Sequence, residues 1–218
     1  MHKVITLVSV FTILLLVSCN SGESDKCLNS YGQTKVTEYF SDSYFLSAIR
    51  NLLDIAEDAP IFAESVNNKK VLDLGFSPIV DLSGIEHFTS LEVLRLDSNG
   101  RLTNVNLCRN TNRTHIYLFD TNFAYLNLSN IPNLLEVRLG HAHELELLNI
   151  SDNGNLKVLI IGRAINLSTL DVLSNANLRK LVITDSLIEK FDLSANVQLE
   201  VLNINRFYVS SHIPEVGG

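Results

Sequence analysis

The chain has 218 residues, of which 46% are apolar and 19% are charged, a composition typical of a globular protein with one continuous core. Acidic residues outnumber basic ones by 24 to 17, and no stretch gathers the lysines and arginines into a stripe. Since such a stripe is the signature of nucleic-acid binding, nucleic acid is excluded as an expected partner.

The N-terminus has the pattern of an export signal. A short basic start precedes an apolar run over residues 4–17, which is too short to cross a bilayer comfortably. Residues 16–19 are Leu-Val-Ser-Cys and resemble the lipobox of bacterial lipoproteins. The resemblance implies that a signal peptide (1–18) is cleaved before Cys19, which receives a lipid and joins the chain to a membrane. An ordinary secretory signal with an incidental cysteine is the alternative.

The segment after this signal predicts a flexible tether over residues 19–35, because its first residues are small and polar. Asn20 stands where lipoproteins retained at the inner membrane often carry aspartate, so the resemblance favours the outer membrane and leaves the leaflet open. An exported chain can pair Cys27 with Cys108 in a disulfide. Nothing local in the sequence brings the two together, and free thiols are the plainer interpretation.

Residues 36–68 predict a helical N-terminal cap in front of the repeats that follow. Residues 41–43 are Ser-Asp-Ser and offer side-chain oxygens for the first turn of a helix. Five apolar residues then share one helical face: Phe45, Ile49, Leu52, Leu53 and Ala56. A shorter helix is expected to begin at Pro60. It would point three apolar residues inward: Ile61, Phe62 and Val66.

The junction between these helices has the spacing of a calcium-binding loop that related lipoproteins often carry, from Asp54 to Ile61. Ala56 stands where an oxygen ligand is needed, and Ala59 replaces the glycine of the sharp turn. Glu64 comes one residue early for bidentate ligation. We therefore expect a solvated acidic junction without a metal.

From Lys69 to residue 205 the sequence repeats itself every 21 or 22 residues on the template Leu-x-x-Leu-x-Leu. The copies begin at Lys69, Leu91, Arg113, Leu134, Leu156, Leu178 and Leu199. The same spacing returns half a unit later, as in Leu145-Leu148-Ile150. A short strand buries its apolar face only when neighbours stack on it, so we expect seven stacked coils, each with two apolar edges.

One turn of the unit carries asparagine at the same place in four copies: Asn110, Asn153, Asn175 and Asn196. Ile131 is the exception in this column. Asparagine satisfies the backbone groups of turns with its side-chain amide, so stacked copies are expected to stabilise these turns.

Two half-units, Leu-Asn-Leu-Ser-Asn at 126–130 and Phe-Asp-Leu-Ser-Ala-Asn at 191–196, resemble the short bacterial class of leucine-rich repeats with two strands per coil. Residues 79–88 are similar to the first repeats of internalin-like surface proteins. Together the resemblance covers residues 69–205. It implies an α/β repeat fold, a mostly-β leucine-rich-repeat solenoid whose concave surface recognises partners.

The third, fifth and seventh positions of each template strand face that concave surface, because the leucines point into the core. The candidate partner-binding residues there are Arg95, His115, Tyr117, Phe119, Glu136, Arg138 and Ile160. Exposed aromatics ringed by arginine have the composition of an interaction hot spot. An apolar strip would extend the surface through Val158, Ile160, Val182 and Val201. The alternative is that these side chains cover neighbouring backbone and bind nothing.

An enzyme is not expected, since catalysis needs groups that converge on a pocket and a thin solenoid offers shallow curvature. The densest ligand-like cluster is His-Ala-His-Glu at 141–144, which lacks the H-E-x-x-H spacing and lies in a turn. The sequence has no phosphate-binding glycine loop and no G-x-S-x-G motif. We expect no catalytic residue, metal or cofactor.

The resemblance implies a cell-envelope lipoprotein that recognises or adheres to a protein, for example on a host or neighbouring cell. The first alternative is a glycan-binding accessory protein of an outer-membrane uptake system, with Tyr117 and Phe119 as the sugar platform. The second is a structural envelope component that assembles through its C-terminal end. Residues 206–218 form a short tail, and either Phe207 and Tyr208 fold over the last coil or that end pairs with another chain.

Overall fold

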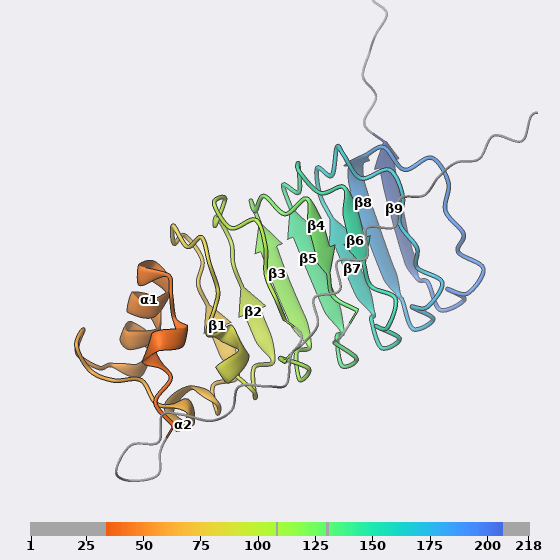
Figure 1. The fold of residues 1–218 in the computed structure, drawn as a ribbon. Coiled ribbons are helices and arrows are strands. Elements are labelled where there is room, and N and C mark those ends of the chain that lie inside the picture. Colours follow the sequence, from red (N-terminus) through yellow and green to blue (C-terminus); the bar gives the residue numbers. More distant parts are fainter. Residues whose placement is uncertain (1–33, 108, 130, 207–218) are drawn as a thin grey trace, which may run out of the picture.

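The computed structural model describes residues 34–107, 109–129 and 131–206. These residues form an elongated stack of coils, with helices at one end and a sheet of parallel strands along one side (Figure 1). The expected signal peptide, Cys19 and most of the expected tether lie outside the described residues. The two other cysteines and the tail beyond residue 206 also lie outside them.

Seven strands, one from each repeat, pair in parallel in a single sheet. They are β1 (Val71–Asp73), β2 (Val93–Arg95), β3 (His115–Phe119), β5 (Glu136–Gly140), β7 (Val158–Ile161), β8 (Lys180–Ser186) and β9 (Val201–Arg206). Equivalent positions of successive coils pair, so that Leu72 lies beside Leu94 and Leu94 beside Ile116. The mostly-β solenoid expected from the repeat is therefore confirmed.

The second apolar edge of the unit forms strands in only two coils of the described chain. There, β4 (Tyr125–Asn127) and β6 (Leu147–Asn149) make a small parallel sheet. The corresponding edges elsewhere bury residues such as Leu102 and Ile188 without forming a strand. The second apolar edge is therefore buried as expected, but it forms a ladder in only two described coils, because an apolar edge can be buried without the hydrogen bonds of a sheet.

The leucine template supplies a continuous core. The second residues of the first six strands of this sheet are at most 1% exposed: Leu72, Leu94, Ile116, Val137, Leu159 and Leu181. Full burial of such a side chain stabilises a fold by roughly 1.5–3 kcal/mol. Leu202 has the same place in β9 but is 50% exposed, because no strand within the described ranges lies beyond β9.

The asparagine column forms a buried ladder of hydrogen bonds between coils, as expected. Asn110 donates through Nδ2 to the carbonyl oxygens of Ile85 (2.9 Å) and Phe88 (3.0 Å). The same bridge between two carbonyls is made by Asn153, Asn175 and Asn196. A buried carbonyl without a partner costs about 1–3 kcal/mol, so the ladder holds neighbouring coils in register.

Arg113 occupies the leading leucine position of the third coil, and its side chain is fully buried. None of its three guanidinium nitrogens has a hydrogen-bond partner within the described part of the chain. Burial lowers the pKa of this guanidinium to about 9. Because a buried and unpaired cation is unfavourable, the leucine column is weakened at this coil.

Helix α1 (Ser43–Leu53) begins where the sequence predicts. The carboxylate of Asp42 accepts hydrogen bonds from the backbone N–H groups of Tyr44 (2.8 Å) and Phe45 (2.9 Å), as an N-cap does. The ring of Phe40 packs edge-on against Phe45 and Phe88, with centroids 5.4 and 6.4 Å away. These rings join α1 to the first coil.

The apolar face expected for this helix was wrong at two of its five residues. Phe45 and Ile49 are buried, but Leu52 is exposed. Ala56 lies beyond the helix, because Asp54 adopts a left-handed conformation with φ of 53° and ends it.

Helix α2 (Ala63–Val66) begins later than the expected start at Pro60. Phe62 forms an isolated antiparallel bridge with Lys35, which keeps the backbone extended up to that residue. Ile61 and Val66 are buried as expected, whereas Phe62 is half-buried. Two 3-10 helices complete the described elements, at Thr37–Tyr39 and Ile85–His87.

Candidate partner-binding surface

The expected contact residues lie on neighbouring strands of the seven-stranded sheet. Arg95, Tyr117 and Arg138 pair in register across β2, β3 and β5. His115 and Glu136 pair in register two residues earlier on β3 and β5. Neighbouring strands are about 4.8 Å apart, so these five side chains share one small area of the open face of the sheet.

Tyr117 is the centre of this cluster. The guanidinium carbon of Arg95 lies 4.8 Å from the centroid of its ring, which is a cation–π contact. The ring of His115 is stacked with it, with centroids 6.3 Å apart and planes 20° apart. Partial burial and the charge of Glu136 raise the pKa of the Tyr117 phenol. The hydroxyl therefore stays protonated at neutral pH and can donate a hydrogen bond.

Two further contacts order the polar part of the cluster. Arg138 donates through Nε to Oε1 of Glu136, which makes an ion pair within β5. The hydroxyl of Thr114 and Nδ1 of His115 are 2.8 Å apart, and the same hydroxyl donates to the carbonyl oxygen of Glu92 at 3.2 Å. The imidazole of His115 and the guanidinium of Arg138 are therefore both positioned by contacts within the chain.

Phe119 lies at the end of β3, next to Gly140 in β5. A Cβ atom added to Gly140 would lie 2.1 Å from Cδ1 and 2.4 Å from Cε1 of Phe119, so the ring covers the glycine. The ring is still 41% exposed. Gly140 stands in the coil after Phe119, at the equivalent position of the unit. A glycine next to an aromatic residue of the preceding coil was therefore a signal in the sequence, but sequence reasoning missed the role of Gly140.

Ile160 connects the polar cluster to an apolar strip. It pairs with Arg138 on one side and with Val182 on the other. Val158 and Val182 are half-buried, and Val201 is exposed. The open face thus changes from charged and aromatic at β2, β3 and β5 to mostly aliphatic at β7, β8 and β9, where Lys180 and Asn203 are the polar residues in register with the strip.

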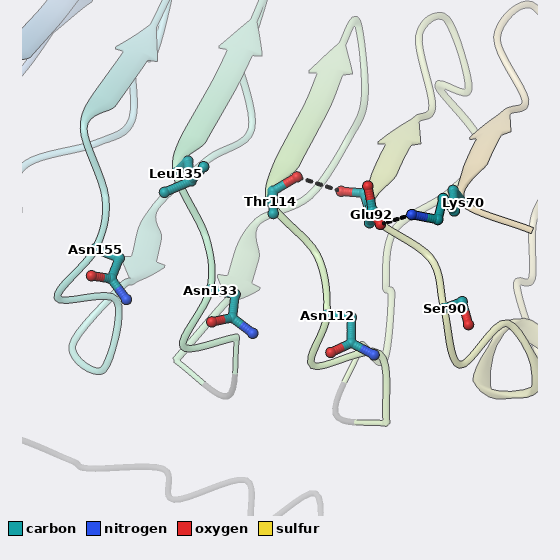
Figure 2. Close-up of a pocket in the computed structure, with 8 residues that line it drawn as sticks. All are labelled: Lys70, Ser90, Glu92, Asn112, Thr114, Asn133, Leu135 and Asn155. Atoms are coloured by element: carbon teal, nitrogen blue, oxygen red, sulfur yellow. Dashed lines mark hydrogen bonds and ion pairs between the residues drawn. The ribbon is translucent and has the colours of Figure 1, made fainter.

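A groove that sequence reasoning missed lies beside the start of these strands (Figure 2). It has a volume of about 480 Å³ and is lined by Lys70, Ser90, Glu92, Asn112, Thr114, Asn133, Leu135 and Asn155. Figure 2 shows the three asparagines in a row along it. Each donates to the carbonyl oxygen of the coil before it, for example Asn112 to Thr89 at 2.9 Å. The available signal was an asparagine one residue before each of three template starts.

No metal-binding cluster accompanies this surface in the described ranges. No group of three or more histidine, cysteine, aspartate or glutamate side chains there is arranged to hold a metal ion. The rings of His141 and His143 are 5.9 Å apart, and Nδ1 of His141 is 3.9 Å from Oδ1 of Asp120. Between residues 34 and 206, no described helix has the length and hydropathy needed to span a membrane.

Comparison with known proteins gives the same architecture. No family model and no curated protein sequence matches the chain. The functional domain of InlJ from Listeria monocytogenes, which includes a cysteine ladder, aligns with 83% of this chain and 44% of its own at 23% identity and a TM-score of 0.60. The internalin inlF from the same species aligns with 81% of this chain and 60% of its own at 20% identity and a TM-score of 0.57. The chain spans less than two thirds of either protein, and its fold is a leucine-rich-repeat solenoid like theirs.

Proposed function

We propose that this chain is a non-catalytic cell-surface protein that recognises or adheres to another protein through the open face of its seven-stranded sheet. The contact residues are Arg95, His115, Tyr117, Phe119, Glu136, Arg138 and Ile160. The observation that carries the proposal is the stack of Arg95, Tyr117 and His115 next to the Glu136–Arg138 ion pair. Aromatic and arginine side chains dominate the binding energy of protein interfaces.

The contacts among the side chains of the cluster support this function, because they hold these side chains in place before a partner binds. Tyr117 contacts both Arg95 and His115, and the ring of Phe119 rests on Gly140. Immobilising a flexible side chain on binding costs about 0.5–1.5 kcal/mol, so side chains that are already held retain more of their contact energy. The neighbouring aliphatic strip around Ile160 would form the dry centre of the interface, with the charged residues at its rim.

The chain is further proposed to be held in the cell envelope, at the outer membrane, by a lipid on Cys19. Residues 19–35 would form the tether, residues 36–68 the helical cap, residues 69–205 the repeats and residues 206–218 the tail. The lipobox-like residues 16–19 support the anchor. The position of α1 and α2 at the start of the stack supports the cap, since an open solenoid end exposes core. The partner would be a protein on a host or neighbouring cell.

Bead adhesion tests the proposed surface. Beads coated with residues 20–218 are applied to intact host cells and to neighbouring bacteria, before and after surface proteolysis. We expect adhesion that proteolysis removes and that the double substitution Tyr117→Ala and Arg138→Ala weakens about tenfold or more. Tyr125→Ala is the matched control, because this tyrosine is 62% exposed on the small second sheet. Equal adhesion of the double variant and the unchanged chain would reject this surface.

The groove supports a second candidate function, the binding of a glycan by an accessory protein of an uptake system. Sugar hydroxyls both donate and accept hydrogen bonds, and the exposed amides of Asn112, Asn133 and Asn155 can do the same. Tyr117 and Phe119 would provide the rings for stacking. A glycan array separates the candidates: binding that Asn133→Ala removes, and that proteolysis of the target leaves intact, favours the glycan.

A further inference from the structure

Strand β9 (Val201–Arg206) is the last strand of the seven-stranded sheet in the described chain, and only β8 pairs with it there. The backbone N–H of Val201 donates to the carbonyl oxygen of Arg179 at 2.9 Å. Alternate residues of a parallel strand bond to opposite neighbours. Residues 201 and 203 therefore bond towards β8, and the backbone groups of Leu202 and Ile204 face away from it. After Ile204 the register with β8 shifts, so that Arg206 pairs with Ser186.

Within residues 34–206, this edge combines backbone groups that no described strand pairs with and apolar side chains. Leu202 is 50% exposed and Val201 is 44% exposed. A strand edge of this kind is a template for pairing with another strand, unless a charge, a proline or a covering segment blocks it. Between residues 201 and 205 there is neither a charged residue nor a proline.

The sequence of the edge is complementary to itself. When Glu200-Val-Leu-Asn-Ile-Asn-Arg206 is laid antiparallel on a second copy about Asn203, Leu202 comes opposite Ile204. Both of these residues turn their backbone groups outward, so they would form the hydrogen-bonded pairs of an antiparallel ladder. The same register sets Glu200 of each chain opposite the position of Arg206 in the other, where opposite charges select this alignment.

We propose that two copies of this chain pair through β9 in this register and form one sheet that continues across both chains. The occupant of the edge is a second copy because the charges at the two ends of the strand match only when the strand meets itself in reverse. The β9 edge is separated from the strands that carry the proposed contact residues, β2, β3, β5 and β7, by β8. The pairing therefore leaves that surface open on both copies and does not depend on the proposed function.

Light scattering of residues 20–218 over a concentration series tests the pairing. We expect the mass of a dimer that dissociates on dilution. Glu200→Arg and Arg206→Glu, each alone, are expected to raise the dissociation constant about tenfold or more, and the two together to restore it. Arg179→Ala is the control, because it removes only the exposed ion pair of Glu200 within the chain (3.5 Å). Thermal unfolding of each variant serves to check that the coils remain folded.

A monomer at every concentration overturns the proposal. If the full chain is a monomer but a chain shortened to end at residue 206 dimerises, residues 207–218 are the partner of the edge instead of a second copy. A double variant that stays as weak as the single ones also overturns the register, since charge exchange must restore a self-complementary pair.

Discussion

The ring of Phe119 rests on the backbone of Gly140, at a distance that leaves no room for a methyl group. Gly140→Ala is therefore expected to push the ring from its place and to lower the free energy of unfolding by about 1–3 kcal/mol, as overpacking does. Urea unfolding measures the change, and bead adhesion shows whether the displaced ring also weakens binding.

Gly162→Ala is the matched control for this prediction. Gly162 occupies the equivalent position one coil later, and a Cβ atom there would meet its nearest neighbours at 3.8 Å, an ordinary contact distance. We expect a change within about 0.5 kcal/mol. Equal effects of the two substitutions would mean that the ring of Phe119 does not lie on Gly140.

Asn175 tests the buried ladder. Its Nδ2 donates to the carbonyl oxygens of Ile150 (3.0 Å) and Asn153 (2.9 Å). Asn175→Ala leaves both without this donor, so we expect a loss of about 1–3 kcal/mol in the free energy of unfolding. Asn177→Ala is the control and should cost less, because the hydrogen bonds of this half-buried residue are exposed: it donates to the carbonyl oxygen of Gly154 (2.9 Å) and accepts from Nε2 of Gln198 (3.4 Å). A smaller effect at Asn175 than at Asn177 contradicts the ladder as a source of stability.

The period of the sequence was sufficient to predict the sheet and the neighbours within the candidate surface. With 21 or 22 residues per coil, Arg95, Tyr117 and Arg138 must lie side by side once the leucines are in register. This prediction needs no knowledge of individual contacts, because a solenoid places equivalent positions of successive repeats next to one another.

Features that depend on contacts between unlike positions could not be read in this way. The end of α1 is set by the left-handed conformation of Asp54, and neither Leu52 nor Ala56 marks it in the sequence. The contact between Phe119 and Gly140 depends on the rotamer of the ring. The groove depends on side chains from the turns before the strands, whose direction the strand pattern does not specify.

The proposed lipid anchor gives a prediction in cells. Cys19→Ser is expected to move the protein from the membrane fraction to the soluble fraction and to abolish its labelling by a radioactive fatty acid, because no thiol remains at the lipobox-like site. Cys27→Ser keeps the lipobox-like residues and should leave both readouts unchanged. Labelling that persists in Cys19→Ser would exclude this residue as the lipid site.

Arg113 gives a prediction about stability and pH. Burial lowers the pKa of its guanidinium to about 9, well below the ordinary value of an arginine. Below pH 9 the side chain is charged in both the folded and the unfolded chain, so the full cost of burying the charge is present. Above about pH 9 this arginine loses its proton in the folded chain but keeps it in the unfolded chain, so the unfolded chain binds more protons. The stability of the unchanged protein therefore rises with pH relative to a variant without this group.

Arg113→Leu restores the leucine of the template and is expected to raise the free energy of unfolding by roughly 1–4 kcal/mol at pH 7. The difference between the variant and the unchanged protein should shrink as the pH rises above about 9. Urea unfolding at pH 7, 9 and 10 measures both effects. Arg101→Leu is the control, because Arg101 is exposed and its loss should change neither value. A destabilised Arg113→Leu would mean that the guanidinium has a favourable partner in the folded chain.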